Sequence, residues 1–241
     1  MNNTEIKAVL FDLDGTLIDT APDFIRIIKV MCAKHNHPCP TDEAIREQVS
    51  AGARAMVKLM FGELANIADD APQAEKQLLA YRQEFLDTYE ADICVDSRLF
   101  DGLDELLLTL ESNGILWGIV TNKPRYLTEI LLDKLNLTER CSVLVCPDDV
   151  KNTKPDPEPM FLAVSKLNDK FDLDLVAENC VYVGDHIRDI QAGKSANMRT
   201  ILAGYGYIPP QDQHDLNSWG ADVITHSVEE MTDYIRDWTG V

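Results

Sequence analysis

The sequence predicts an α/β fold, a Rossmann-like, doubly wound parallel sheet with an all-helical cap domain inserted into it. Short apolar, β-branched runs alternate with amphipathic helical segments through most of the 241 residues. Such alternation is typical of βαβ units whose sheet is buried on both faces. One long stretch shows only helical patterns. Polar residues follow directly after several of the apolar runs, where the carboxyl ends of parallel strands would meet.

Six apolar runs predict the strands of this sheet. They are Ala8–Phe11, Ile115–Val120, Val143–Val145, Cys180–Val183, Thr200–Leu202 and Asp222–Ile224. In the segments between them apolar residues recur every three or four positions, for example over 103–110 and 127–135. That spacing gives a helix one buried face, so we expect helices to connect the strands.

The stretch from about Asp19 to Asp96 contains no strand pattern. Helical spacing is present over 24–31 and 78–89, and Ala71-Pro72 has the character of a helix start. We therefore predict a core domain formed by 1–18 and 97–241 and a helical cap domain over 19–96. An insertion directly after the first strand would lie over the carboxyl edge of the sheet, where open α/β sheets bind ligands.

The charge balance restricts the partners. Asp and Glu outnumber Lys and Arg by 41 to 22, which gives a formal net charge of −19. Such a chain would repel nucleic acids and anionic membrane surfaces, so we expect neither as a partner. A small phosphorylated metabolite fits only if positive charge is concentrated at its binding site. The sequence leaves open whether the protein is a monomer or a homodimer.

Composition and the first residues indicate a cytoplasmic protein. No apolar run approaches the roughly 20 residues that span a bilayer. Met1–Glu5 lack the basic and apolar parts of a signal peptide. The six cysteines show no CxxC spacing of a metal site. Several of them lie in apolar surroundings, as expected of reduced thiols in the cytoplasm.

Two carboxylates, Asp12 and Asp14, lie where an apolar strand gives way to a glycine turn. Residues i and i+2 of an extended chain point to the same side, so both side chains can face one point. Two like charges held that close resist joint ionisation. A divalent cation would stabilise the pair, as would a division of labour between a nucleophile and a proton carrier. A simple Asp-Gly turn is the alternative.

Groups suited to phosphate follow the next two strands. Thr121 offers a hydroxyl, and the backbone N–H groups from Asn122 onward lie near a helix start, where phosphate binds. Lys154 stands in a proline-flanked turn and would offset phosphate charge. Taken singly, Thr121 could also be a helix cap, and Lys154 could be a solvated surface residue.

The fourth strand leads into two more carboxylates. Asp185 follows Gly184 directly, and Asp189 lies four residues later on the same face of a helical turn. Magnesium prefers oxygen ligands from one or two carboxylates together with water and substrate. Asp12, Asp185 and a backbone carbonyl near Asp14 would form such a site. Helix capping would explain Asp185 or Asp189 taken singly. It does not explain four acidic residues and a lysine at one edge of a sheet.

Four motifs in this order resemble those of the haloacid dehalogenase superfamily. They are DLDGT at Asp12–Thr16, Thr121, Lys154 in KPDP, and GDHIRD at Gly184–Asp189. The resemblance covers nearly the whole chain and includes a helical cap after the first motif. It implies a magnesium-dependent phosphatase that works through an aspartyl-phosphate intermediate.

The resemblance also implies roles for the acidic residues. Asp12 would be the nucleophile that attacks phosphorus. Asp14 would protonate the leaving oxygen and then deprotonate the water that hydrolyses the intermediate. Mg²⁺ would be held by Asp12, the Asp14 main chain and Asp185.

The remaining motif residues would bind the phosphoryl group and support the site. By the same resemblance, its oxygens would be held by Thr121, Asn122 and Lys154. Asp189 would orient Lys154 or a metal-bound water. His186 is expected to face solvent on a helix, and we predict no role for it.

Within the superfamily, the cap position and the overall pattern look most like the phosphoglycolate phosphatase group. A further resemblance, to bacterial N-acetylmuramic acid 6-phosphate phosphatases, is carried by Ser50–Met56, Trp117–Pro124, Gly204–Ile208 and Trp219–Asp222. It implies N-acetylmuramic acid 6-phosphate, and with it cell-wall recycling, as the first candidate. The second candidate substrate is 2-phosphoglycolate.

Arg54 is the candidate for contacting the end of the substrate that carries no phosphate. It lies beside Gly52 in a turn between predicted cap helices, and its guanidinium could bind a carboxylate with two hydrogen bonds. Both candidate substrates carry a carboxylate, so Arg54 does not distinguish them. A surface arginine at a helix start is the alternative reading. Lys123 is a weaker candidate of the same kind.

Three other functions share parts of this pattern. A phosphomutase of the β-phosphoglucomutase type uses the same motifs and a similar cap, but it must protect its phosphoenzyme from water. A haloacid dehalogenase is disfavoured, because Asp14 supplies a proton transfer that carbon–halogen displacement does not need. A catalytically silent binding protein is compatible with the fold, but every motif residue is present.

Overall fold

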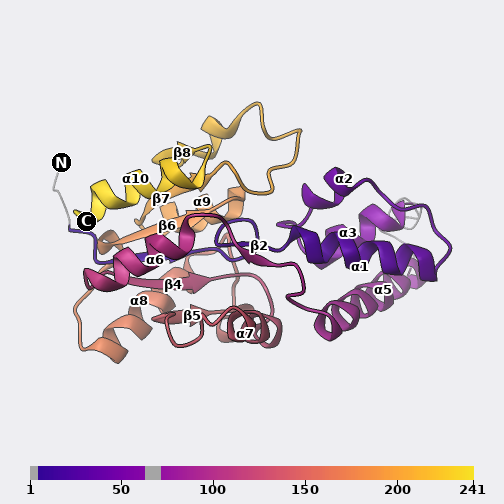
Figure 1. Ribbon diagram of the computed structural model, residues 1–241, viewed down its shortest axis with the longest axis horizontal. Helices are drawn as coiled ribbons and strands as arrows, with labels where there is room; N and C mark the ends of the chain where they lie inside the picture. Colours follow the sequence, from indigo (N-terminus) through magenta and orange to yellow (C-terminus); the bar gives the residue numbers. More distant parts are fainter. Residues whose placement is uncertain (1–4, 63–71) are drawn as a thin grey trace.

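The centre of the protein is a six-stranded parallel sheet in the order β5-β4-β1-β6-β7-β8 (Figure 1). The structure is a computed structural model that describes residues 5–62 and 72–241. The strands are β1 (Ala8–Phe11), β4 (Leu116–Val120), β5 (Val143–Val145), β6 (Cys180–Gly184), β7 (Arg199–Ala203) and β8 (Val223–Thr225). All six predicted strands are confirmed, with shifts of at most one residue at their ends.

Helices cover both faces of the sheet, as a doubly wound fold requires. The four residues of β1 are fully buried and alternate between two apolar cores, one on each face. One core includes α8 (Glu158–Phe171) and α9 (Ile187–Ser195). The other includes α6 (Leu103–Ser112), α7 (Arg125–Lys134) and α10 (Val228–Thr239).

The register of the sheet brings three strand ends to one level. Phe11, the last residue of β1, pairs with Ile119 on β4 and with Val183 on β6. Side chains that follow these three strands therefore start from neighbouring points of the carboxyl edge. This is the edge to which the sequence assigns the polar residues.

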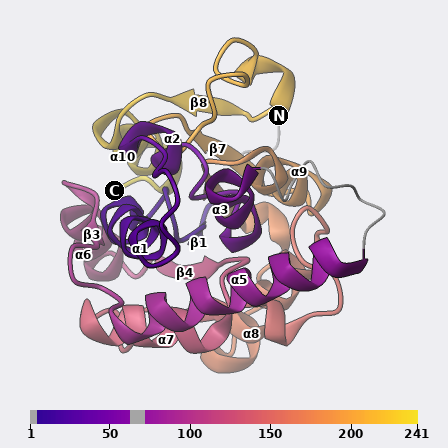
Figure 2. The same ribbon diagram turned by 90° about the vertical axis from the view of Figure 1, so that its right-hand side faces the viewer.

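The helices inserted after the first strand lie together at the end of the molecule opposite the C-terminus (Figures 1 and 2). They are α1 (Ala21–Lys34), α2 (Asp42–Arg46), α3 (Ala53–Met60) and α5 (Pro72–Ala91). Their contact includes stacked rings, with Phe24 lying 5.5 Å from Phe85 and 4.8 Å from Tyr89 between centroids. The predicted helix start is observed at Pro72, and Ala71 lies outside the described residues.

A two-stranded antiparallel ribbon joins the inserted helices to the sheet. It pairs β2 (Ile18–Asp19) with β3 (Arg98–Leu99). This ribbon was not predicted from the sequence, because a strand of two residues is too short to show a hydrophobic pattern. The ribbon lies at both predicted boundaries of the cap. The division into 1–18, 19–96 and 97–241 stays a prediction.

Two further observations concern the cellular setting. Across 5–62 and 72–241, none of the helices combines the length and the apolar character needed to cross a membrane. The six cysteines are free thiols, as the sequence predicts. The cytoplasmic location stays a prediction.

A buried carboxylate in α1 fastens the inserted helices to the segment that leaves them. Asp23 accepts hydrogen bonds from the backbone N–H groups of Asp96, at 2.9 Å, and Ser97, at 3.2 Å. The Ser97 hydroxyl also donates to it, and Arg26 pairs with it at 2.6 Å. Burial opposes ionisation, but these donors and the arginine charge together hold the pKa of Asp23 below its ordinary value.

We expect Asp23→Asn to lower the free energy of unfolding by about 1–3 kcal/mol near pH 7, because a charged hydrogen-bond acceptor is lost. The folded pKa lies below the ordinary value of 3.8. The contribution of Asp23 is therefore complete above that value and is lost as the pH falls through the folded pKa. Chemical denaturation of wild type and variant at neutral and strongly acidic pH measures this difference.

The difference should shrink on acidification, and an equal difference at both pH values would contradict the assignment. Asp96→Asn serves as the control. The Asp96 side chain is 52% exposed and lies 3.4 Å from Arg26. An exposed ion pair of this kind adds little to stability, so this variant should unfold with nearly the wild-type free energy.

Candidate active site

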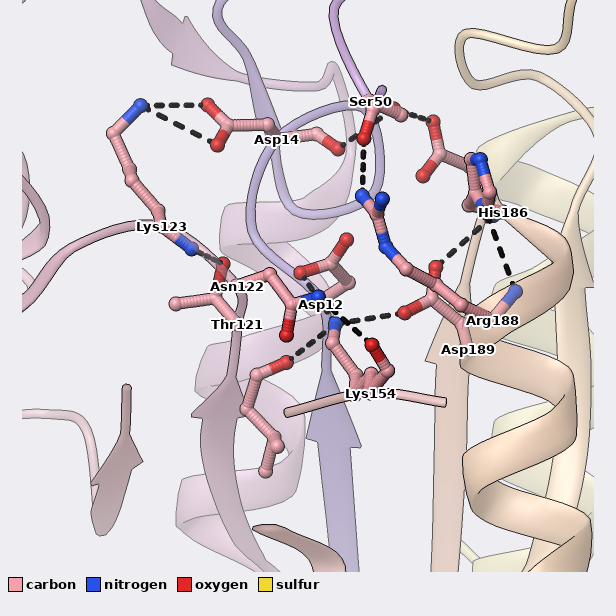
Figure 3. A network of polar contacts seen from close by, with 12 residues as sticks. Asp12, Asp14, Ser50, Thr121, Asn122, Lys123, Lys154, His186, Arg188 and Asp189 are labelled. Carbon is pink, nitrogen blue, oxygen red and sulfur yellow. Dashed lines mark hydrogen bonds and ion pairs between the residues drawn. The ribbon is translucent and has the colours of Figure 1, made fainter. Parts of the chain in front are cut away.

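The candidate site lies where β4, β1 and β6 end. Asp12 follows β1, Thr121 follows β4 and Asp185 follows β6, so each is the first residue beyond its strand. Lys154 and Asp189 reach the same point from the loop before α8 and from the first turn of α9 (Figure 3). The sequence prediction that these side chains meet at one edge of the sheet is consistent with this geometry.

A buried lysine forms the centre of the site. The side chain of Lys154 is fully buried, and its Nζ lies 2.9 Å from Asp12 Oδ1 and 2.7 Å from Asp189 Oδ1. The same ammonium donates to the Val120 carbonyl at 2.9 Å and to the Tyr182 hydroxyl at 2.8 Å. Lys154 is therefore a fixed interior charge, and the surface alternative is excluded.

The electrostatic environment keeps Asp12 ionised. Its burial alone would raise the pKa, but the charges of Lys154 and Arg188, together with hydrogen bonds from Lys154 and the Leu13 backbone, hold the pKa of Asp12 below its ordinary value. A carboxylate that carries its charge in a buried site has lost its water shell. It is therefore available as a nucleophile or as a metal ligand.

The two carboxylate oxygens of Asp185 have different surroundings. Oδ2 accepts hydrogen bonds from Ser50 Oγ at 2.7 Å and from the Tyr207 backbone N–H at 2.8 Å. Oδ1 is buried, and no group in the described parts of the chain bonds to it. Burial and the neighbouring charges of Asp12 and Asp189 raise the pKa of Asp185 to about 7.

These carboxylates form a cluster that fits a divalent cation. Asp12, Asp185 and Asp189 each offer an oxygen within 4.8 Å of the others. A cation would partner the orphaned Asp185 Oδ1 and offset the repulsion that raises the Asp185 pKa. Only glycine fits at position 15, beside the Asp185 carboxylate. A Cβ at this position would lie 2.2 Å from Asp185 Oδ2, and the φ of +82° is one that other residues rarely adopt.

The side chain of Asp14 turns away from this cluster. Its carboxylate accepts a hydrogen bond from Thr20 Oγ1 at 2.7 Å and lies 3.0 Å from Lys123 Nζ. That ammonium also donates to the Tyr89 hydroxyl at 3.1 Å and lies over the Phe24 ring. Asp14 and Asp12 therefore occupy different surroundings, which suits the two different roles expected of them.

The residues predicted to bind phosphate line the β4 end of the site. Thr121 is buried and its Oγ1 accepts a hydrogen bond from the Lys123 backbone N–H at 3.1 Å. The side-chain amide of Asn122 donates to the Lys154 carbonyl at 3.1 Å. Asn122 therefore positions the backbone of Lys154 as well as lying beside the pocket.

The expectation for His186 is wrong. Its side chain is half-buried and precedes α9 as the N-cap, with Nδ1 accepting a hydrogen bond from the Arg188 backbone N–H at 3.2 Å. Asp189 completes this cap by accepting from the His186 N–H at 3.0 Å. Burial and the nearby Arg188 charge lower the pKa of His186 to about 4, so the ring is neutral. The sequence pattern did not show that the helix begins one residue later.

A pocket of about 350 Å³ opens from the carboxylates toward the inserted helices. Apolar residues of α1, α5 and α7 form much of its wall. Positive charge is concentrated in it, as an anionic substrate of an acidic protein requires, and the basic residues that line it are Arg54, Arg82, Lys123 and Arg188. Arg54, the second residue of α3, is half-exposed and lies 3.1 Å from Glu75.

Four of the residues at this site were not predicted from the sequence. They are Ser50, Arg82, Tyr89 and Arg188. Each comes from a helical segment or a loop whose pattern is that of ordinary structure, and only the folding of the chain brings it to the site. Two of the four have a sequence signal, because Arg188 lies inside the GDHIRD motif and Ser50 begins the Ser50–Met56 segment that carries the further resemblance.

The chain resembles known phosphatases over nearly its whole length. Residues 9–203 match the model of the haloacid dehalogenase-like hydrolase family. The N-acetylmuramic acid 6-phosphate phosphatase of Pseudomonas aeruginosa is 44% identical over 98% of this chain and 97% of its own. The enzyme of that name from Pseudomonas putida is 47% identical over 93% and 94%. A phosphoglycolate phosphatase of Xanthomonas campestris pv. campestris is 40% identical over 93% and 94%.

Solved structures share the fold. A protein of Lactobacillus delbrueckii subsp. bulgaricus has a TM-score of 0.80 at 22% identity, covering 96% of this chain and 98% of that one. A haloacid dehalogenase-like family hydrolase of Streptococcus pneumoniae has a TM-score of 0.75 at 19% identity, covering 98% and 100%. The predicted α/β fold is confirmed.

We expect Asp185→Asn to raise the melting temperature when divalent metal is absent at pH 8. With a folded pKa of about 7, ionised Asp185 destabilises the fold. This cost is absent below the ordinary value of 3.8, grows between the two values and is complete above about pH 7. Thermal unfolding at several pH values should therefore show the difference vanish near pH 4.

Added Mg²⁺ should reverse this order. It stabilises only the protein that binds it, so the wild type should gain stability and Asp185→Asn should gain little. An equal gain in both proteins would show that the cation binds elsewhere.

Proposed function

Because the chain belongs to the haloacid dehalogenase-like hydrolase family and is a phosphatase, we propose that it hydrolyses N-acetylmuramic acid 6-phosphate through an aspartyl-phosphate on Asp12. The observation that carries the proposal is the buried Asp12–Lys154–Asp189 cluster at the base of a pocket lined with basic side chains. We place the reaction in the cytoplasm, as a step of cell-wall recycling.

In the first step, an oxygen of Asp12 attacks the phosphorus in line with the ester oxygen. The bond between phosphorus and the ester oxygen breaks, and that oxygen takes a proton from Asp14. Lys154 holds Asp12 Oδ1 at 2.9 Å and keeps positive charge beside the phosphoryl oxygens. The Thr121 hydroxyl and the backbone from Asn122 lie beside the pocket, where these oxygens would be held.

In the second step, Asp14 takes a proton from water, and the water oxygen attacks the same phosphorus. Phosphate leaves and the Asp12 carboxylate is restored. Asp12, Asp185 and the Asp14 main chain would hold Mg²⁺, with Asp189 in the same cluster, and the cation would stabilise negative charge on the phosphoryl group. Thr20 and Lys123 orient the Asp14 carboxylate throughout.

The size and lining of the pocket favour the sugar phosphate. Its 350 Å³ lies within the range of roughly 300–1,000 Å³ typical of small-molecule sites. A two-carbon substrate such as 2-phosphoglycolate would leave the wall of Phe85, Leu86 and Leu127 without contact. The acetyl and lactyl groups of N-acetylmuramic acid can contact such a wall, and the lactyl carboxylate suits Arg54.

Kinetics on the two substrates in parallel test this proposal. We expect kcat/KM for N-acetylmuramic acid 6-phosphate to exceed that for 2-phosphoglycolate by at least about a hundredfold, because only the larger substrate uses the pocket wall. Phosphate release should require Mg²⁺, and Asp12→Asn should release none. The reverse ratio would favour 2-phosphoglycolate, the substrate that the name of the Xanthomonas relative indicates. Interconversion of sugar phosphates without phosphate release would indicate a mutase.

Arg54→Ala should lower kcat/KM for N-acetylmuramic acid 6-phosphate by at least about tenfold, because one charged contact to the carboxylate is lost. Lys58→Ala is the matched control, since Lys58 is an exposed cation on the same helix that does not line the pocket. Steady-state kinetics of both variants decide the matter. Unchanged kinetics in Arg54→Ala would remove Arg54 from the binding site.

A further inference from the structure

Ser50 is a residue of the inserted segment that reaches the carboxylate cluster. It lies in the turn between α2 and α3, and its exposed fraction is 4%. The turn is closed by backbone hydrogen bonds from Ala51 to Gln48 at 3.1 Å and from Gly52 to Val49 at 2.9 Å. Val49 is 2% exposed and belongs to the apolar core, so an apolar anchor holds the turn in place.

Ser50 contacts three groups at the ends of β1 and β6. Its Oγ donates to Asp185 Oδ2 at 2.7 Å and lies 3.4 Å from the Asp14 carbonyl. Its own carbonyl accepts a hydrogen bond from Arg188 Nη2 (Figure 3). Ser50 and the sheet edge therefore exchange hydrogen bonds in both directions.

The contact to Asp185 fixes the direction of that carboxylate. Oδ2 is occupied by the Ser50 hydroxyl and the Tyr207 N–H. Oδ1 is thereby left as the buried oxygen that bonds to no group in the described residues, on a carboxylate that lies in one cluster with Asp12 and Asp189. Outer partners of this kind orient the groups that bind a metal. In this protein the partner comes from the inserted helices, so it is present only while they rest on the sheet.

We propose that Ser50 is a positioning residue that couples divalent-metal binding to the docking of the inserted helices on the sheet. This inference shares one premise with the proposed function, namely that the carboxylate cluster binds a divalent metal. Coupling between two equilibria is reciprocal. Docking should tighten the metal site, and bound metal should hold the helices in place before any substrate arrives.

The Ser50→Ala variant tests the coupling without substrate. Mn²⁺ binding, followed by electron paramagnetic resonance with Mg²⁺ as competitor, should show an affinity about tenfold weaker than that of the wild type, the smaller end of the effect typical of outer partners. Thr41→Ala is the matched control. It removes a hydroxyl that caps α2 at 3.2 Å in the same segment and does not touch the carboxylates.

Hydrogen exchange supplies the second readout. In the wild type, Mn²⁺ should slow amide exchange over residues 47–56, and in Ser50→Ala this metal-dependent protection should be lost. The Thr41→Ala control is expected to exchange faster over α2 in both conditions, because its cap is weakened, and to keep the metal-dependent protection.

The outcomes separate this inference from the proposed function. If Ser50→Ala binds Mn²⁺ within twofold of the wild type, or if the metal leaves exchange over 47–56 unchanged in the wild type, the coupling is overturned and the metal site stands. If the wild type itself fails to bind Mn²⁺ or Mg²⁺, both the coupling and the metal part of the proposed function are overturned.

Discussion

The buried ammonium of Lys154 is the interaction on which the rest of the site depends. It lies between Asp12 and Asp189, at 2.9 and 2.7 Å, in a protein whose net charge is −19. Removing one partner from a buried ion pair leaves an uncompensated charge, which costs far more than the pair itself contributes. Lys154 therefore allows two carboxylates to remain close together in the interior, as the proposed attack of Asp12 on a phosphoryl group requires.

The topology of the sheet supplies the other half of the arrangement. Because β1 lies between β4 and β6, the residues that follow these three strands begin at neighbouring points of the sheet edge. Even short side chains such as those of Asp12, Thr121 and Asp185 can therefore lie at one site. The inserted segment then covers the site, with Ser50 at the carboxylate cluster and Tyr89 at the Lys123–Asp14 pair. These contacts link the carboxylates at the sheet edge to the helices that line the pocket, as lids are linked to active sites in other enzymes.

Much of this could be predicted from the sequence, for identifiable reasons. Short apolar, β-branched runs located β1, β4 and β6, and the residues following each strand then had to share one edge. Contacts between distant segments left no such trace. In the sequence, Ser50 has the pattern of a loop residue and Tyr89 that of a core aromatic residue. The burial of Lys154 depends on its contacts with Val120 and Tyr182, which come from two other segments of the chain. His186 was misread because the cap of α9 depends on a helix start that the pattern does not fix to one residue.

The central claim is that Asp12 itself attacks the phosphorus. The stereochemical course at phosphorus tests this claim more directly than a rate of hydrolysis does. The substrate for this measurement is N-acetylmuramic acid 6-phosphate whose phosphate is made chiral with oxygen isotopes and sulfur. Two successive in-line displacements, first by Asp12 and then by water, each invert the configuration. Overall retention is therefore expected in the released thiophosphate. Overall inversion would show that water attacks in a single step and would contradict the role assigned to Asp12.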